Sequence, residues 1–153
     1  MTRRILCVCH GNTCRSPMAQ GVLEALAREA GLPVEVDSAG TAPRGSGVPP
    51  DPRALTAAAA RGYDIAAQRT RAVAAGDFAR FDLVLAMDRA TLDALARLRP
   101  PGPGTAPRLL DPQGRDIADP FAGGPADYAR ALDLIEAAAR DLIAELAPAP
   151  GQA

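Results

Sequence analysis

Tryptophan and lysine are missing from this 153-residue sequence, which has only two tyrosines and three phenylalanines. All 17 basic residues are therefore arginines, which we interpret as a product of genome composition. The net charge of −1 provides no long-range attraction to nucleic acid or acidic membranes, and no basic run is dense enough to suggest either partner. We accordingly expect no nucleic-acid partner.

Long hydrophobic runs are also missing. The longest are far too short to cross a bilayer, and the basic start at 1–4 leads into a run of strand length, not a signal-peptide core. The only three cysteines lie close together at positions 7, 9 and 14, so they cannot join distant parts of the chain. This spacing favours a reducing compartment. We expect a cytoplasmic protein with no membrane partner.

Apolar runs of strand length alternate along the chain with helical patterns. Strands are expected at about 4–9, 34–37, 83–86 and 108–110, and helices at about 17–30, 53–61, 72–78, 88–98 and 125–146. The alternation predicts an α/β fold, a single three-layer domain with a four-stranded parallel sheet and helices on both faces. We place this domain at 1–147, a length that buries roughly 70% of the unfolded surface without disulfides or metals. The tail at 148–153 is predicted to be disordered.

The segment Cys9-His10-Gly11-Asn12-Thr13-Cys14-Arg15-Ser16-Pro17 lies between the first strand and the first helix. A loop in that place directs backbone N–H groups and the positive end of the helix dipole at one point, so it favours an anion such as phosphate. The same groups would favour the thiolate form of Cys9, which could then act as a nucleophile. Arg15 could hold two phosphoryl oxygens in its planar fork.

Three polar residues near this loop have structural interpretations as well. Asn12 is expected in a left-handed conformation, from which its side chain would brace the loop. Ser16 is a candidate helix cap, with Pro17 at the first helical position, and also a hydrogen-bond donor to the Cys9 thiolate. Ser38, at the end of the second strand, either belongs to the same network or is a turn residue.

A cysteine followed after five residues by Arg and Ser is the signature of cysteine-dependent phosphatases. The fuller string at 8–17 resembles the low-molecular-weight protein tyrosine phosphatases, and the resemblance continues at 37–41, 49–51, 82–88 and 119–121. It implies the strand order 2-1-3-4, no cofactor, and hydrolysis of phosphotyrosine through a cysteinyl-phosphate intermediate. The expected partner is a phosphorylated protein or peptide, with inorganic phosphate or vanadate as a competing anion.

The resemblance also implies roles for individual residues. Asp119 matches the family's Asp-Pro-aromatic motif and would donate a proton to the leaving oxygen, whereas Asp111-Pro112 is a rival on spacing alone. The catalytic residues would be Cys9, Arg15 and Asp119. The substrate-binding residues would be His10, Gly11, Asn12, Thr13, Cys14, Ser16, Phe121 and Arg44. A reversible Cys9–Cys14 disulfide that protects the nucleophile is implied in the same way.

The sequence departs from the tyrosine phosphatase pattern at two positions that bear on the substrate. The stretch at 42–46 has Arg44 where the family usually has an aromatic wall, which leaves Phe121 as the remaining ring. Arg44 and Arg53 are expected at the rim of the cleft, where they would meet acidic residues of a peptide. Thr13 stands where tyrosine phosphatases have isoleucine and the related protein arginine phosphatases have threonine. Phosphoarginine is therefore the alternative substrate.

Three other functions fit the sequence less well. Cys7, Cys9, His10 and Cys14 include ligand types that suit zinc, but Cys7 and Cys9 share a strand face committed to the core, and no second ligand pair follows. A phosphate-binding module without turnover would gain nothing from a buried thiolate at Cys9. An arsenate reductase would need further cysteines near 80–90, and the sequence has none there.

Overall fold

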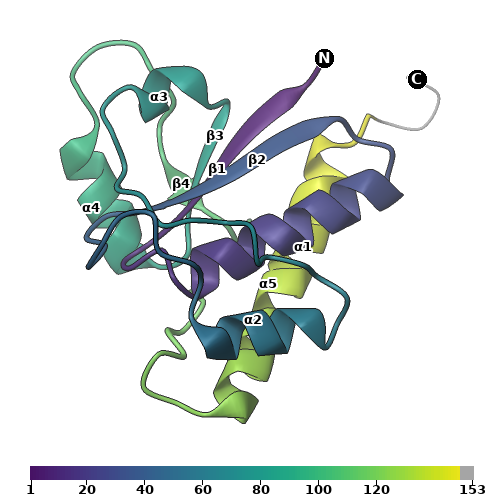
Figure 1. Cartoon of the computed structure of the whole chain (residues 1–153). Coiled ribbons are helices and arrows are strands. Elements are labelled where there is room, and N and C mark those ends of the chain that lie inside the picture. The colour runs from purple at the N-terminus through teal and green to yellow at the C-terminus, as the bar shows by residue number, and fades with distance from the viewer. Residues whose placement is uncertain (149–153) are drawn as a thin grey trace.

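The computed structural model describes residues 1–148, and Figure 1 shows the elements in chain order. The strands are β1 (Arg3–Cys9), β2 (Val34–Gly40), β3 (Leu83–Ala86) and β4 (Arg108–Leu109). The helices are α1 (Arg15–Glu29), α2 (Pro52–Ala59), α3 (Asp77–Arg80), α4 (Arg89–Leu98) and α5 (Pro125–Leu146). The predicted disordered tail, apart from the exposed Pro148, lies outside the described residues. No helix within residues 1–148 is both long and apolar enough to cross a membrane.

The four strands form one parallel sheet in the order β2-β1-β3-β4, which confirms the predicted fold class and strand order. β1 lies in the middle and is buried from Ile5 to Cys9, because helices cover both of its faces. Cys9 pairs with Gly40 of β2, and Val8 pairs with Ala86 of β3. The carboxyl ends of these three strands therefore meet at one edge of the sheet, where open α/β folds bind ligands.

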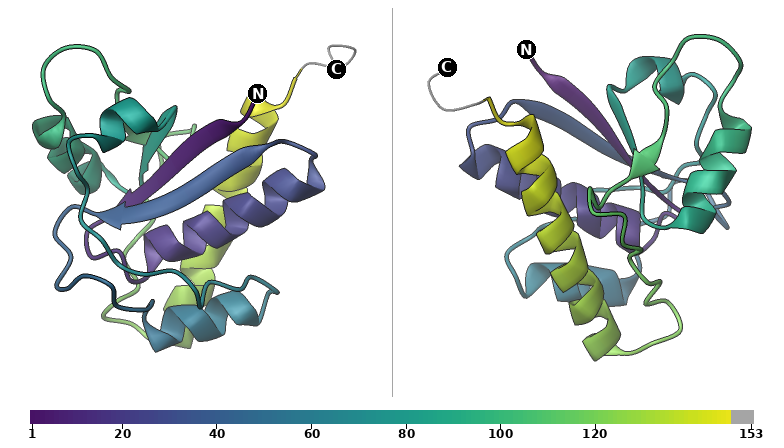
Figure 2. Two further views of the ribbon diagram at one scale, coloured as in Figure 1. Left: turned by 45° about the horizontal axis from the view of Figure 1, so that its top comes forward. Right: turned by 180° about the vertical axis from the view of Figure 1, so that it is seen from behind.

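The two faces of the sheet bury separate hydrophobic clusters. Side chains of Ile5, Cys7 and Cys9 pack with α1, α2 and α5, whereas Leu6 and Val8 pack against the α3 and α4 side. Figure 2 shows the resulting three layers, with α1, α2 and α5 on one face of the sheet and α3 and α4 on the other. The predicted core position of Cys7 is confirmed, since its side chain is fully buried.

The predicted helix at 72–78 is wrong. Ala72 instead forms an isolated bridge with Gly40, the amide of Val73 donates to the Gly40 carbonyl, and a single helical turn begins only at Asp77. Backbone pairing with the end of β2 outweighs the local helical pattern, because it satisfies amide and carbonyl groups in a partly buried segment. This pairing brings the 70–73 segment beside the loop that follows β1.

The cap at the start of α1 also differs from the expectation. α1 begins at Arg15, its N-cap is Cys14, and no side chain caps it, so the predicted capping role of Ser16 is wrong. Ser16 lies inside the first turn, where its hydroxyl is directed to the loop. Pro17 is tolerated there because the first helical N–H groups have no partner within the helix. α4 does have a side-chain cap, since Asp88 is its N-cap residue and Asp88 Oδ1 accepts a 2.8 Å hydrogen bond from the Thr91 amide.

Candidate active site

Cys9 ends β1 at the floor of the loop, and its side chain is only 3% exposed. The backbone amide of Asn12 donates a 3.2 Å hydrogen bond to Sγ, and the Ser16 hydroxyl lies 3.0 Å from the same sulfur. The N-terminus of α1 follows directly, so the positive end of its dipole faces the loop. Hydrogen-bond donors and dipole together favour negative charge on Cys9 Sγ.

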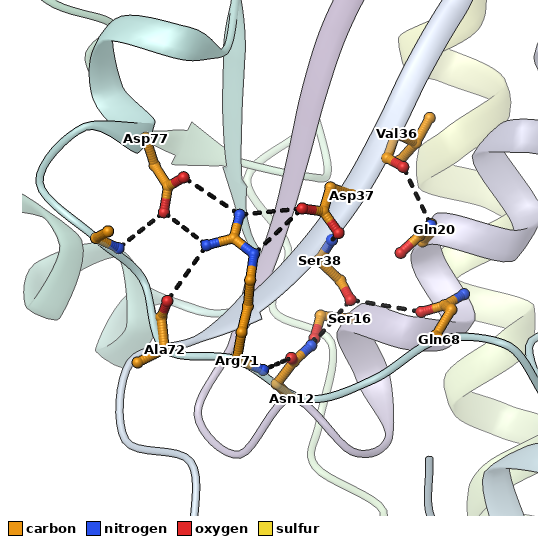
Figure 3. Close-up of polar contacts among 11 residues, drawn as sticks. Asn12, Ser16, Gln20, Val36, Asp37, Ser38, Gln68, Arg71, Ala72 and Asp77 are labelled. Carbon is orange, nitrogen blue, oxygen red and sulfur yellow. Dashed lines mark hydrogen bonds and ion pairs between the residues drawn. The ribbon is translucent and has the colours of Figure 1, made fainter. Parts of the chain in front are cut away.

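Asn12 is the non-glycine residue with a positive φ in the described chain, at 57°, and this confirms the predicted left-handed conformation. Its Nδ2 donates to the hydroxyls of Ser16 and Ser38, at 2.9 Å in each case. Its Oδ1 accepts a 3.0 Å hydrogen bond from the backbone amide of Arg71. The Asn12 side chain thus bridges α1, β2 and the 70–73 segment, and Ser38 belongs to this network (Figure 3).

Arg71 is fixed in turn by two carboxylates, as Figure 3 shows. Its guanidinium forms ion pairs with Asp37 at 3.1 Å and with Asp77 at 2.9 Å, and the Asp77 side chain is 1% exposed. Gln68 extends the network, because its Oε1 lies 3.4 Å from the Ser38 hydroxyl and its Nε2 donates to the Pro17 carbonyl. Sequence reasoning missed the support from Gln68, Arg71 and Asp77, since none of these three residues belongs to a motif that the sequence analysis identified.

Arg15 is almost completely buried, with 3% of its side chain exposed. Its Nη1 donates to Asp88 Oδ2 at 2.6 Å and to the Ile117 carbonyl at 2.8 Å, and its Nη2 lies 3.7 Å from Asp119 Oδ2. Burial opposes ionisation of Asp88, but hydrogen bonds from Arg15 and Thr91 outweigh it and hold the pKa of that carboxyl below its usual value. The guanidinium therefore has a fixed orientation at the cavity.

The two Asp-Pro loops occupy different environments. The Asp119 side chain is half exposed, lines the cavity in front of Cys9, and accepts a 3.0 Å hydrogen bond from the Phe121 amide. The Asp111 side chain is 3% exposed and binds Arg115 and the Gln113 amide away from that cavity. Of these two carboxyl groups, Asp119 is the one that reaches the loop.

A cavity of about 660 Å³ opens over the loop. Loop residues form its floor, and its walls bring together the predicted residues Arg44, Asp119 and Phe121 with an apolar side that sequence reasoning missed. This apolar side consists of Ala42, Val48, Pro49, Pro50, Pro52 and Leu55. Asn12 and Ser16, predicted to bind substrate, do not line the cavity but support its floor through the network above.

Phe121 is 46% exposed at the rim of this cavity, between two arginines. The guanidinium carbons of Arg44 and Arg53 lie 5.6 and 5.3 Å from the centre of its ring. Arg53 is also bound to Asp51 at 3.0 Å and donates to the carbonyls of Phe121 and Gly123. These contacts use most of the N–H donors of Arg53 to hold the walls together, so little of its hydrogen-bonding capacity is open to acidic peptide residues. That role of Arg53 stays a prediction.

Cys14 contacts a second buried side chain that no motif indicated. Its Sγ lies 3.2 Å from the hydroxyl of Tyr128, which is fully buried in α5. Burial raises the pKa of the Cys14 thiol, in spite of hydrogen bonds from Tyr128 and Thr13 that act in the opposite direction.

Cys7, Cys9 and Cys14 are all free thiols. Residues 1–148 contain no group of three or more His, Cys, Asp or Glu side chains arranged to hold a metal ion.

A parallel α/β sheet whose first strand ends in a buried thiol, beside a loop of backbone amides and a fixed arginine, is the architecture of a cysteine-dependent phosphatase. The chain belongs to the low molecular weight phosphotyrosine protein phosphatase family, whose family model matches residues 4–150. This match confirms the resemblance stated from the sequence and places the chain in a family of hydrolytic enzymes.

Individual relatives agree with this assignment. A Streptomyces coelicolor protein named low molecular weight protein-tyrosine-phosphatase is 41% identical over 154 residues, covering 94% of this chain and 93% of the relative. The structure of Vibrio vulnificus Wzb in complex with benzylphosphonate has a TM-score of 0.84 and 29% identity, covering 94% of this chain and 99% of that one. The structure of YwlE arginine phosphatase, with a phosphorylated active site serine, has a TM-score of 0.84 and 28% identity, covering 94% and 95%.

Proposed function

We propose that this protein hydrolyses phosphotyrosine in proteins or peptides, with Cys9 as the nucleophile and no metal or cofactor. The observation that carries the proposal is the set of contacts around one sulfur: the Asn12 amide and the Ser16 hydroxyl at 3.2 and 3.0 Å from Cys9 Sγ. These contacts favour a thiolate at the end of a loop whose remaining amides and Arg15 suit the phosphoryl oxygens.

In the first step, Cys9 Sγ attacks phosphorus, a sulfur–phosphorus bond forms, and the bond from phosphorus to the tyrosine oxygen breaks. Arg15 stabilises the charge that spreads over the equatorial oxygens, and its contacts to Asp88 and Ile117 hold the guanidinium ready for that task. Asp119 donates its proton to the departing phenolate oxygen. The products are tyrosine and a cysteinyl phosphate.

In the second step, a water molecule attacks the phosphorus of the cysteinyl phosphate. Asp119, now a carboxylate, accepts a proton from this water as the sulfur–phosphorus bond breaks. Inorganic phosphate leaves, and Cys9 returns to its thiolate form, which the Ser16 hydroxyl stabilises as a leaving group. Inorganic phosphate and vanadate should therefore compete with the substrate for the loop.

The walls of the cavity support an aromatic substrate. Val48, Pro49, Pro50 and Leu55 supply apolar surface on one side, and the half-exposed ring of Phe121 supplies an aromatic surface at the rim. The structure of Wzb with benzylphosphonate supports the same class of ligand, since that molecule joins an aromatic ring to a phosphonate.

Phosphoarginine is the second candidate, because Thr13 lines the cavity and the arginine phosphatase YwlE shares the fold. A guanidinium substrate needs acceptors that remain open in the cavity. Both carboxylate oxygens of Asp51 are already occupied by Arg53, which leaves Asp119 at the mouth and the Thr13 hydroxyl. This shortage of acceptors favours the phosphotyrosine proposal.

The experiment that tests the proposed function compares Cys9→Ser and Arg15→Ala with the native protein, using p-nitrophenyl phosphate. Each variant should abolish turnover, EDTA should have no effect, and vanadate should inhibit the native protein competitively. Radiolabel from a phosphorus-labelled substrate should be trapped on the rapidly denatured native protein as a thiol phosphate, which iodine cleaves, and this iodine-sensitive form should be absent from Cys9→Ser. Retention of most of the rate by Cys9→Ser would rule out the covalent mechanism.

A further inference from the structure

A second hollow, of about 550 Å³, adjoins the substrate cavity on the α4 side. The two hollows share four lining residues: His10, Arg15, Ala42 and Asp119. The other residues that line the second hollow are Thr41, Asp88, Ala90, Thr91, Ala94, Arg97 and Leu98. A chain whose phosphorylated side chain enters the first hollow can therefore continue across the shared wall into the second.

The floor of this second hollow is the outer face of α4. Ala90, Ala94 and Leu98 are spaced four residues apart, so they lie in one row along the helix, and Leu98 is 46% exposed. The small side chains of the two alanines leave room in front of the helix. The buried residues Thr91 and Leu95 hold α4 against the sheet, so this floor belongs to a packed element and not to a loop.

The charges in the second hollow are distributed unevenly. Arg15 and Asp88 neutralise each other through their 2.6 Å ion pair. Within residues 1–148, Arg97 makes no hydrogen bond and no ion pair, although it lies at the end of α4 farthest from the loop. A carboxylate near that end would find an uncompensated cation.

We propose that this second hollow, the α4 groove, binds the segment of the substrate that flanks the phosphotyrosine. The occupant is an extended peptide with an aliphatic side chain over Ala90 and Ala94 and an acidic side chain at Arg97. The row from Ala90 to Leu98 is about 12 Å long, at about 1.5 Å per helical residue. An extended chain advances about 3.3 Å per residue, so the α4 groove accommodates about four substrate residues.

This inference rests on the proposed function, and it names the sequence context of the substrate. Continuity with the substrate cavity identifies the occupant, because the shared wall of His10 and Asp119 leads directly from one hollow to the other. Phe121 and Arg44 line only the substrate cavity, so the α4 groove adds a separate surface, and the sequence offered no candidate residue for it.

The test uses two phosphotyrosine peptides of equal length. One has leucine two residues and glutamate four residues from the phosphotyrosine on each side, and the other has serine and glutamine at those places. The native protein should have a kcat/KM about tenfold higher for the first peptide, an effect typical of one well-placed interface side chain. Ala94→Phe, which fills the α4 groove, should remove the preference. Ala96→Phe, an exposed change outside the groove, should retain it.

Arg97 is tested separately through charge. Arg97→Glu should lower kcat/KM for the acidic peptide roughly fivefold, and about 0.5 M salt should produce a similar loss in the native protein, because an exposed ion pair is screened. The peptide with serine and glutamine should be insensitive to Arg97→Glu. Salt should lower its kcat/KM less than that of the acidic peptide, because both peptides share the charge of the phosphate. Equal loss for both peptides would show that Arg97→Glu acts on the fold or the loop, and it would overturn the assignment of Arg97.

Two outcomes would overturn the α4 groove as a peptide site: equal kcat/KM of the native protein for the two peptides, or equal effects of Ala94→Phe and Ala96→Phe. A dimer that Ala94→Phe dissociates, without any change in peptide preference, would assign the groove to a second copy of this chain instead. Failure of the proposed function would look different from failure of the α4 groove, because the native protein would then not turn over p-nitrophenyl phosphate at all.

Discussion

The backbone amide of Arg71 donates a 3.0 Å hydrogen bond to Oδ1 of Asn12, across 59 residues of sequence. This contact ties the loop around Cys9 to a segment that is itself paired with Gly40 at the end of β2. The backbone amide of Asn12 is also the donor to Cys9 Sγ. Contacts that hold Asn12 in place therefore also hold this donor in place. The side chain of Arg71, held by Asp37 and Asp77, anchors the segment in turn.

The first prediction concerns the conformation and the side chain of Asn12 separately. Asn12→Gly retains the positive φ at no steric cost but loses three hydrogen bonds, whereas Asn12→Ala loses the same bonds and also adopts a left-handed conformation that costs about 1–2 kcal/mol. Both variants should lower kcat, and the free energy of unfolding should be lower for Asn12→Ala than for Asn12→Gly. Urea unfolding measures the difference, and equal stabilities would contradict a strained residue at this position.

The second prediction concerns the close approach of Gly40 to the loop. A Cβ at position 40 would lie 2.8 Å from the His10 carbonyl oxygen and 3.0 Å from the Asn12 Cβ, so Gly40→Ala must displace the loop. Overpacking of this kind costs about 1–3 kcal/mol of stability, and kcat should fall with it. Gly76→Ala is the matched control, because no atom lies within 4 Å of the position that a Cβ at residue 76 would occupy. This variant should leave kcat unchanged. Native kinetics in Gly40→Ala would show that the loop has room to move.

The third prediction separates the two Asp-Pro carboxylates. Asp119→Asn should lower kcat by about 10²- to 10⁴-fold for phosphotyrosine, whose phenolate needs a proton to leave, and by much less for p-nitrophenyl phosphate. Asp111→Asn should change kcat little, because the Asp111 side chain is buried against Arg115 and does not line the cavity. A larger loss from Asp111→Asn than from Asp119→Asn would contradict the assignment of the proton donor.

The sheet and its helices could be predicted from the sequence because each element has a local signal of its own. The pattern from Pro125 to Leu146 leads to a helix with the expected bounds, and the apolar run at 5–9 leads to a strand that begins one residue earlier than expected. The 72–78 segment has no comparable signal, since its conformation depends on hydrogen bonds with Gly40 that a local pattern does not contain. For the same reason the Pro-rich 48–52 segment gave no sign that it forms a wall of the cavity.

The loop itself could be predicted because its chemistry is contiguous in sequence, from Cys9 to Arg15. The residues that position it are not contiguous: Asp88 holds Arg15 from 73 residues away, and Gln68 reaches Ser38 across 30. The sequence allows Ser16 two roles, and the structure supports the contact with Cys9 but not the helix cap, because α1 begins two residues earlier than expected. The roles of these residues in turnover stay predictions.

The fourth prediction concerns stability in acid. Burial opposes ionisation of Asp111, but hydrogen bonds from Arg115 and Gln113 outweigh it and hold its pKa below the usual value. The unfolded chain therefore binds a proton at Asp111 before the folded protein does, so the stabilisation is complete above a pH of about 4 and is lost as the pH falls through the folded pKa. Asp111→Asn should cost about 1–3 kcal/mol at pH 7, and less in acid.

Urea unfolding of the native protein and of Asp111→Asn at neutral pH and at a pH of about 3 measures this change. Asp93→Asn is the control, because Asp93 is exposed and makes no hydrogen bond or ion pair in the described part of the chain. The free energy of unfolding of Asp93→Asn should differ little from that of the native protein at both pH values. If Asp111→Asn lowers the free energy of unfolding by the same amount at both pH values, protonation of Asp111 is not linked to stability.

The last prediction addresses the substrate through Thr13. The native protein should have a higher kcat/KM for a phosphotyrosine peptide than for a phosphoarginine peptide, because the cavity walls are apolar and the carboxylate of Asp51 is occupied by Arg53. Thr13→Ile should strengthen that preference, since it removes the hydroxyl that could bond a guanidinium, and a site that loses a hydrogen bond to its substrate discriminates sharply.

The decisive comparison is kcat/KM for the two peptides in the native protein and in Thr13→Ile, with Thr13→Val as the variant that removes the hydroxyl at nearly constant volume. If phosphoarginine is the better substrate and both variants reverse the order, hydrolysis of phosphoarginine is the function. If only Thr13→Ile changes the order, the cause is cavity volume and not the hydroxyl. If all three proteins prefer the aryl substrate, the apolar walls and Phe121 select the substrate, and Thr13 does not. Loss of a single ring contact would then weaken substrate binding by only about 0.5–1.5 kcal/mol.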